Sequence, residues 1–152
     1  MKNIFYIILV LTFFNCKSAK QNAGNKEKKT IDYIELEKGI CFGKCKAYKI
    51  IINRNGEARY SGKLNVSKTG EYKKNISHEE INDLWKVIEE ADLFKLKDQY
   101  DFDAEDTQPV LLRYSQSEKI KEIHYKLMSP KVLKTIENRL EQIAESEGWE
   151  KL

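Results

Sequence analysis

Residues 47–63, AYKIIINRNGEARYSGK, decide the fold because they encode two strands and the tight turn between them. The first strand is rich in β-branched residues, and its alternation places large apolar side chains on one face: Tyr48, Ile50 and Ile52. Asn55-Gly56 follows, which is the strongest short-range signal for a β-hairpin. Residues 57–63 return as the second strand, so this stretch predicts an antiparallel sheet with one buried face.

An amphipathic helix is predicted downstream of the hairpin. Ser77 and Glu80 have the Ser-x-x-Glu spacing of a capping box, in which the serine hydroxyl accepts a backbone hydrogen bond at the helix start. The apolar residues that follow recur at spacings of three and four: Ile81, Leu84, Trp85 and Ile88. Charged residues occupy the opposite face, so this helix is expected to bury one stripe and to end near Ala91.

The remaining segments complete an α+β pattern. Further strands are expected at these ranges: 33–37, 71–76, 110–114 and 119–125. A last helix is expected to begin with Pro130 at its first position and to stop at Gly148. Its buried stripe is Leu133, Ile136, Leu140 and Ile143. The order is roughly ββββαββα, and two amphipathic helices need one face of the antiparallel sheet, so the sequence predicts a two-layer α+β domain over residues 31–152.

The first sixteen residues have the composition of an export signal. Lys2 gives a positive start, and the eleven residues 4–14 that follow are almost entirely apolar. Eleven residues are too few to span a hydrocarbon core, which needs about 20. Cys16 comes where cleavage is expected, so the segment resembles the lipobox of bacterial lipoproteins, although Asn15 stands where a small residue is usual.

We therefore predict that residues 1–15 are a signal peptide and that Cys16 is lipidated and becomes the mature N-terminus. The alternatives are an ordinary signal peptide cleaved nearby and an anchor that is not cleaved. Residues 16–30 then form the lipidated cysteine and a flexible linker, because residues 17–30 are polar, rich in Lys and Asn, and without periodicity. The predicted partner at this end is the membrane.

The positive net charge of the chain belongs to its N-terminal part. The chain carries +3, of which Lys2 supplies one charge and residues 17–30 supply four, as five lysines against one glutamate. Residues 31–152 therefore carry −2. Nucleic acid is excluded as the expected partner, because a phosphate-binding protein needs its basic patch on the folded surface. The basic linker fits a position near anionic lipid head groups, and a merely solvated linker is the alternative.

Cys41 and Cys45 are the sharpest local feature of the mature chain. An exported pair this close favours a disulfide, and the bridge would require a turn that Gly43 permits. A redox-active or copper-binding pair is the alternative, with His78 or His124 as a distant ligand, but such sites sit in a βαβ frame and here a hairpin follows. Zinc held by both cysteines and both histidines lacks the usual ligand spacing.

Five carboxylates gather in residues 98–106: Asp98, Asp101, Asp103, Glu105 and Asp106. The EF-hand template fails, because it requires Gly and Glu where this chain has Asp106 and Leu112. A solvated acidic loop is therefore expected, with loose calcium binding and paired-carboxylate hydrolysis as the alternatives. Neither a catalytic triad, a phosphate-binding glycine loop nor an HExxH motif is present, so no catalytic residue, cofactor or metal is predicted.

The segment Cys41-Phe42-Gly43-Lys44-Cys45-Lys46-Ala47-Tyr48 resembles the Cys-Phe-Gly-x-Cys-Pro-x-Tyr signature of a family of bacterial envelope lipoproteins that is classed as a domain of unknown function. Lys46 replaces the proline of that signature. The resemblance covers about residues 31–150 and includes the Asn-Gly turn, Leu84-Trp85, the 100–109 segment and Trp149. It implies an exported α+β module and supplies no activity.

Taken together, these features predict an envelope lipoprotein that is not an enzyme and that binds or scaffolds through its small domain. We expect it at the outer membrane, facing the periplasm, with an envelope protein as a further partner. The competing hypothesis is a thiol-redox or copper-handling protein that uses Cys41 and Cys45.

Overall fold

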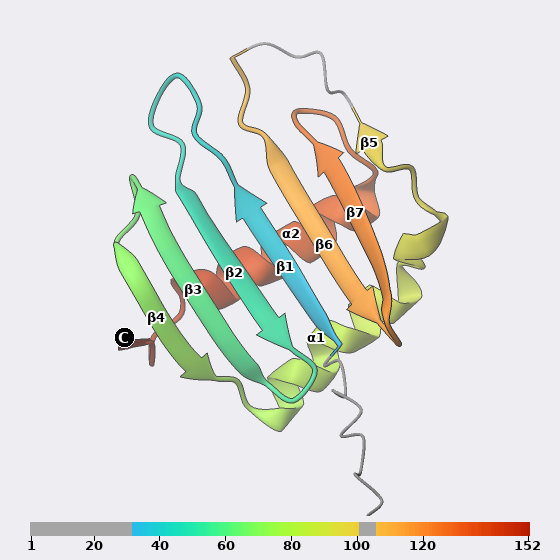
Figure 1. Ribbon diagram of the computed structural model, residues 1–152, viewed down its shortest axis with the longest axis horizontal. Coiled ribbons are helices and arrows are strands. Elements are labelled where there is room, and N and C mark those ends of the chain that lie inside the picture. Colours follow the sequence, from blue (N-terminus) through green and yellow to red (C-terminus); the bar gives the residue numbers. More distant parts are fainter. Residues whose placement is uncertain (1–31, 101–105) are drawn as a thin grey trace, which may run out of the picture.

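A computed structural model of the chain describes residues 32–100 and 106–152 and shows an α+β fold (Figure 1). In chain order its elements are β1 (Tyr33–Lys38), β2 (Ala47–Asn53), β3 (Glu57–Leu64), β4 (Gly70–Asn75), α1 (His78–Glu90), the 3₁₀-helix η1 (Leu93–Lys95), β5 (Gln99–Tyr100), β6 (Val110–Gln116), β7 (Lys119–Tyr125), α2 (Lys131–Glu145) and β8 (Glu150–Lys151).

The strands form one eight-stranded sheet in the order β5-β7-β6-β1-β2-β3-β4-β8. Neighbouring strands are antiparallel, except that β5 runs parallel to β7. The first strand of the domain therefore lies inside the sheet, with β2 on one side and β6 on the other. Both helices cover the same face (Figure 1), and the predicted two-layer α+β class is confirmed.

Gly56 closes the predicted hairpin between β2 and β3. Its φ is 91°, which L side chains rarely adopt, and a Cβ atom there would lie 2.9 Å from the carbonyl oxygen of Ile76. The carbonyl of Gly56 also accepts a hydrogen bond of 2.9 Å from the Ile76 backbone N–H. The turn and the residue after β4 are thus in direct contact, and only glycine fits between them.

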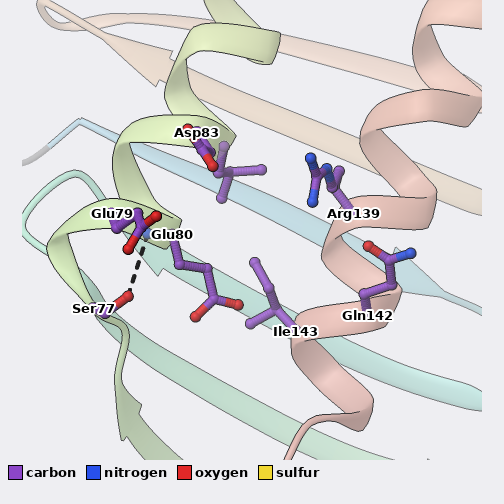
Figure 2. A pocket seen from close by; sticks show the side chains of 8 residues that line it. Ser77, Glu79, Glu80, Asp83, Arg139, Gln142 and Ile143 are labelled. Atoms are coloured by element: carbon purple, nitrogen blue, oxygen red, sulfur yellow. Dashed lines mark hydrogen bonds between the residues drawn. The ribbon is translucent and has the colours of Figure 1, made fainter.

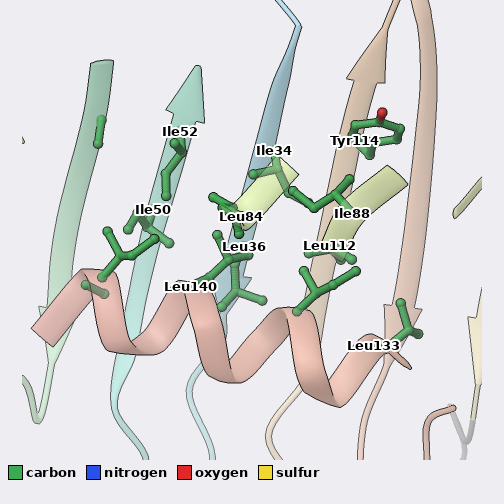
Figure 3. Close-up of a cluster of buried hydrophobic side chains, with 14 of the residues drawn as sticks. Ile34, Leu36, Ile50, Ile52, Leu84, Ile88, Leu112, Tyr114, Leu133 and Leu140 are labelled. Carbon is green, nitrogen blue, oxygen red and sulfur yellow. The ribbon is translucent and has the colours of Figure 1, made fainter. Parts of the chain in front are cut away.

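The start of α1 and the packing of both helices follow the sequence predictions. The Ser77 hydroxyl accepts a hydrogen bond from the Glu80 backbone N–H at 3.2 Å, so the predicted cap of α1 is confirmed (Figure 2). All eight residues of the two predicted apolar stripes are buried. They pack against apolar side chains that point from the central strands toward the helices (Figure 3). Among these strand residues are Ile34, Leu36, Ile50, Ile52 and Leu112.

The opposite face of the sheet is charged and internally paired. Arg113 on β6 donates to the carboxylate of Glu35 at 2.6 Å and to that of Glu122 at 2.7 Å. On the same face, Lys63 on β3 contacts Glu37 on β1 at 2.7 Å. Cross-strand pairs of opposite charge stabilise a solvated sheet face, which explains why no second layer of helices is needed there.

The strand register divides the loops between two ends of the domain. Lys38, Val110 and Tyr125 lie side by side on β1, β6 and β7. The loops that follow β1 and β7 and the residues that precede β6 therefore share one end, at the top of Figure 1, together with the β3–β4 turn. We call this the loop end. The described chain starts at the opposite end, where Asp32 accepts hydrogen bonds from the backbone of Arg54 and Ser117.

Several predicted boundaries were wrong. Pro130 caps α2 with a non-helical ψ of 143° and is not its first helical residue. That helix ends at Glu145, before the predicted stop at Gly148, whose φ of 85° instead turns the chain toward β8. β6 runs to Gln116, so the turn into β7 needs only Ser117 and Glu118, both with positive φ.

Three short elements were missed altogether: η1, β5 and β8. Both strands have two residues and η1 has three, which is too short for any periodicity to be read from the sequence. β5 and β8 form because tertiary contacts place their backbones at the two edges of the sheet. η1 is held by Leu93, which is buried in the hydrophobic core.

Candidate functional site

The loop between β1 and β2, residues 39–46, is closed by a disulfide, and we call it the disulfide loop. Cys41 and Cys45 are bonded with their Cα atoms 5.9 Å apart. Within the ring, the Gly43 N–H donates to the carbonyl of Cys41 at 3.0 Å, and Gly43 has a φ of 154° that suits glycine. The bridge therefore forces a tight turn that has Phe42 at its tip.

The side chain of Gln108, in the segment before β6, is hydrogen-bonded to both ends of the disulfide loop. Its side-chain amide donates to the carbonyl oxygens of Gly39 and Lys46, each at 2.8 Å. The Gly39 N–H in turn donates to the carbonyl of Pro109 at 2.8 Å. A Cβ atom on Gly39 would lie 2.6 Å from the Pro109 ring, so this close approach requires glycine.

Asn65, in the turn after β3, supports the loop from its other side. Its amide nitrogen donates to the carbonyl of Cys45 at 3.1 Å, and more weakly to that of Gly43 at 3.4 Å. Asn65 itself has a φ of 54°, a conformation that asparagine tolerates better than most residues. Two separate segments of the chain and a covalent bond thus fix the backbone of the disulfide loop.

Two apolar side chains of the disulfide loop are exposed to solvent. Phe42 is 92% exposed and Ile40 is 63% exposed. Leu127 and Met128, in the loop between β7 and α2, are 74% and 69% exposed. Of the eight large hydrophobic side chains that are exposed in the described residues, five lie at the loop end: Ile40, Phe42, Leu64, Leu127 and Met128. Such a concentration marks an interaction surface.

Four lysines flank these apolar side chains in the chain: Lys44, Lys46, Lys126 and Lys131. Lys46 pairs with Glu145 at the end of α2. Lys44 and Lys131 are exposed and form no ion pair with the residues that the structure describes. Asp106 lines a pocket of about 480 Å³ together with Ile40, Cys41 and Phe42. Among the described residues, this surface is therefore apolar at its centre and mostly basic around it.

Below this surface lies a buried ion-pair network. Lys38 at the end of β1 contacts the Glu137 carboxylate of α2 at 2.9 Å and also pairs with Glu141. Lys134 reaches the same Glu137 oxygen at 3.1 Å, and the Tyr125 hydroxyl donates to the other oxygen at 3.3 Å. The network joins α2 to the strands directly beneath the loop end.

The ion pairs of this network favour the charged forms of Glu137 and Lys38. Burial alone would raise the pKa of Glu137, but the hydrogen bonds and charges of Lys38 and Lys134 outweigh it and lower that pKa. Burial likewise opposes the charge of Lys38, yet Glu141 and Glu137 raise its pKa. A general acid or base needs a pKa near the working pH, and both groups are shifted away from neutrality, so their arrangement suits structure better than proton transfer.

A second hollow lies between the two helices, with a volume of about 220 Å³ (Figure 2). Glu79, Glu80 and Asp83 line it from α1, and Arg139 and Gln142 line it from α2. The first two carboxylates belong to the first turn of α1, where negative charge stabilises the helix dipole. Helix stability therefore accounts for their position without any ligand.

The other predicted site residues are dispersed. His78 is exposed at the start of α1, and His124 lies on β7, 3.9 Å from Glu122. Neither lines the pocket beside the disulfide. In the part of the chain that the structure describes, no three His, Cys, Asp or Glu side chains form a group that could hold a metal ion.

Two further predictions concern residues that lie wholly or partly outside the described part of the chain. Cys16 and residues 101–105 of the acidic segment lie outside the described residues. Of the remaining acidic residues, Asp98 forms an ion pair with Lys121. Within residues 32–100 and 106–152, the structure has no helix of the length and hydrophobicity required for a membrane span.

Three residues of this surface were not predicted as site residues: Phe42, Asn65 and Gln108. The predicted disulfide implied a turn, and the contacts of Asn65 and Gln108 make that turn a supported loop with Phe42 exposed. One signal was available, because a phenylalanine enclosed between two nearby cysteines in a turn has no core to enter. The amide contacts of Asn65 and Gln108 had no sequence signal, since they join residues 20 and 62 positions apart.

The sequence of this chain matches a known protein family. The chain matches no curated protein. Residues 32–144 match the Domain of unknown function DUF6438, a range that begins just before β1 and ends within α2. The match covers most of the chain, and this protein therefore belongs to the DUF6438 family.

Proposed function

We propose that this protein is an envelope lipoprotein that works as a non-enzymatic binding or scaffolding module, with the loop end as its contact surface. The observation that carries the proposal is the 92% exposed Phe42 on a loop fixed by the disulfide, Gln108 and Asn65. An aromatic anchor that becomes buried on binding is a common centre of binding energy, and a rigid loop loses little entropy when it binds. The fixed backbone therefore supports binding through Phe42.

The attachment half of the proposal rests on the N-terminal sequence. A positive start, a short apolar stretch and Cys16 support export and lipidation, with the domain facing the periplasm from the outer membrane. Lipidation makes anchoring stable when more than one acyl chain is attached. The described chain begins at Asp32, at the end of the domain opposite Phe42.

Cys16→Ala tests the attachment. We expect the wild-type protein in the outer-membrane fraction with the mass of a lipidated chain that starts at Cys16. The variant should be soluble or should accumulate as the uncleaved precursor, because it has no thiol to lipidate. Membrane fractionation and mass spectrometry measure both properties. An unchanged mature mass and unchanged fractionation in the variant would rule out the lipoprotein assignment.

A photoreactive amino acid at position 42 tests the contact surface in living cells. Position 120 is a matched control, because Ile120 is 60% exposed on β7 but lies at the other end of the domain. We expect cross-linked adducts, to lipid or to a defined protein, at position 42 and few at position 120. Equal labelling at the two positions would contradict a binding role for the loop end.

A thiol assay distinguishes this proposal from the redox or copper hypothesis. The purified exported protein should contain no free thiol at Cys41 or Cys45, and its state should not change with copper. Thiolates are the nucleophiles and metal ligands of such sites. Stoichiometric copper bound by the reduced protein, and lost in the double variant Cys41→Ser with Cys45→Ser, would reverse the assignment.

A further inference from the structure

We propose that the loop end docks on an anionic lipid surface, with Phe42 and its apolar neighbours entering the head-group region and the surrounding lysines contacting lipid phosphates. The inference deepens the proposed function and rests on it, because lipidation at Cys16 would hold the domain close to a bilayer. The occupant of the loop end is then lipid and not protein.

The shape of the surface favours lipid. Its most exposed apolar side chains stand on the tips of two loops: Ile40 and Phe42 on the disulfide loop, and Leu127 and Met128 after β7. Their exposures of 63–92% mean that they project from the domain. Projecting apolar side chains beside lysines are typical of proteins that lie in the membrane interface.

The charges favour an anionic surface. Lys44 and Lys131 are exposed without an ion pair to the described residues, and Lys46 is neutralised only by the exposed Glu145. Long lysine side chains can place their stems along apolar groups while their ammonium groups reach phosphates. Docking of a second copy on the same surface would instead bring the two sets of lysines together, which opposes self-association.

The length of the linker permits this orientation. Cys16 and Asp32 are separated by sixteen residue steps, which can span at most about 55 Å. The five steps of β1 from Tyr33 to Lys38 rise about 17 Å. A lipid attached to Cys16 can therefore still allow the loop end to turn toward the same bilayer, because the linker is longer than the rise of β1.

Tryptophan fluorescence of the full lipidated chain tests the proposal. The variant Phe42→Trp is reconstituted in vesicles of phosphatidylcholine alone or with phosphatidylglycerol, each containing lipids brominated in their acyl chains. The variant Ile120→Trp is the matched control at the other end of the domain. The parent protein supplies the background of Trp85 and Trp149.

We expect the indole introduced at position 42 to be quenched in the anionic vesicles and to lose that quenching in high salt. The indole introduced at position 120 should show little quenching under either condition, because that end of the domain faces away from the bilayer when the loop end is docked.

Charge variants sharpen the test. Adding Lys44→Ala to Phe42→Trp should lower the equilibrium constant for loop insertion about fivefold, as expected for one lysine near an anionic surface. Lys119→Ala is the control, because Lys119 is exposed at the other end of the domain. Equal effects of the two lysine variants would overturn the proposed role of the basic rim.

A shorter linker tests the geometry. Deletion of residues 19–30 leaves four steps between Cys16 and Asp32, about 14 Å at most, which is less than the rise of β1. This deletion should abolish quenching of the indole at position 42 while the protein stays on the vesicles. Replacement of the same twelve residues by a Gly/Ser run should preserve the quenching.

The outcomes separate this inference from the proposed function. Co-sedimentation of the protein with vesicles reports the lipid anchor alone. If the Phe42→Trp variant on sedimented vesicles is quenched no more than the Ile120→Trp variant, lipid docking is overturned. If protein adducts then form at position 42 in cells, the binding function stands with a protein as the occupant. A blue shift of the Phe42→Trp emission that depends on protein concentration without lipid would indicate self-association and also overturn the inference.

Discussion

Glu137 shows how one charged residue can be kept inside this domain. It is 2% exposed, yet it contacts Lys38, Lys134 and the hydroxyl of Tyr125. Removal of a carboxylate from water is costly, and a buried charge persists only when it is paired and its oxygens are hydrogen-bonded. Both oxygens of Glu137 have partners, so the residue fixes the position of α2 against β1 and β7.

Lys38→Met should destabilise the protein at pH 7 by about 3 kcal/mol, because it removes the closest partner of a buried carboxylate. The pKa of Glu137 is lowered in the folded state, so the contribution of the pair is present above the unfolded pKa near 4.5 and is lost as the pH falls through the folded value. The pKa of Lys38 is raised, so the same contribution is lost at the alkaline end only as the pH rises through its folded value above 10.5.

Urea unfolding at pH 7 and at pH 3 measures this dependence. The difference in free energy of unfolding between wild type and Lys38→Met should shrink at pH 3. Lys63→Met is the matched control, because it removes the more exposed pair with Glu37, and should cost less than about 1 kcal/mol. A penalty for Lys38→Met that is the same at both pH values would show that lost packing, not charge, is responsible.

At the scale of elements, α1 depends on the phase of its apolar stripe. Leu84 is buried between the helix and the sheet, so Leu84→Ala should cost about 2–5 kcal/mol through lost burial and the cavity left behind. Lys86, two residues later, is exposed, and Lys86→Ala should change stability by less than about 0.5 kcal/mol. Chemical denaturation of both variants checks the phase, and similar penalties would mean that the helix is rotated.

The disulfide between Cys41 and Cys45 is expected to make a small contribution to the stability of the protein. The five-residue ring from Cys41 to Cys45 limits the unfolded chain only slightly, so the double change to serine should lower stability by about 2 kcal/mol. Differential scanning calorimetry of the oxidised protein and the double variant measures this. A loss well above this value would mean that the bridge supports the sheet and not just the loop.

At the scale of the whole molecule, the position of β1 sets the order of stability. β1 is paired on both sides, whereas β8 pairs with β4 through only two residues of each strand. Backbone amides in the middle of a sheet exchange through global unfolding, and those at a frayed edge exchange through local opening. The Leu36 amide should therefore exchange with the global free energy of unfolding, and the Leu152 amide, which donates to Glu71 at 2.9 Å, with a much smaller one.

Native-state hydrogen exchange by NMR compares these two amides directly. Equal exchange rates for Leu36 and Leu152 would show that β8 unfolds together with the centre of the sheet and that the short strand is part of the cooperative unit. The Ile50 amide in β2 serves as a second reporter of the centre.

Local sequence determined the long elements of this protein. The Asn55-Gly56 turn, the Ser77 cap and the apolar spacings of both helices encode structure through contacts between residues close in the chain, which is why the α+β class follows from the sequence. The cysteine spacing likewise restricts residues 41–45 to a turn if they are bridged. The end of α2 was not predicted correctly: the sequence indicated Gly148, whereas the helix ends at Glu145 with Ser146 as its C-cap.

Only the tertiary structure decided which segments meet. The sheet order places β1 between β2 and β6, and this brings Gln108 to the disulfide loop and Glu137 to Lys38 across separations of 62 and 99 residues. Such contacts leave no periodic signal, because they depend on strand register and helix position together. The exposure of Phe42 depends on tertiary structure in the same way. Hydrogen bonds from Asn65 and Gln108 fix the backbone of the disulfide loop, and in this conformation the ring of Phe42 is exposed to solvent.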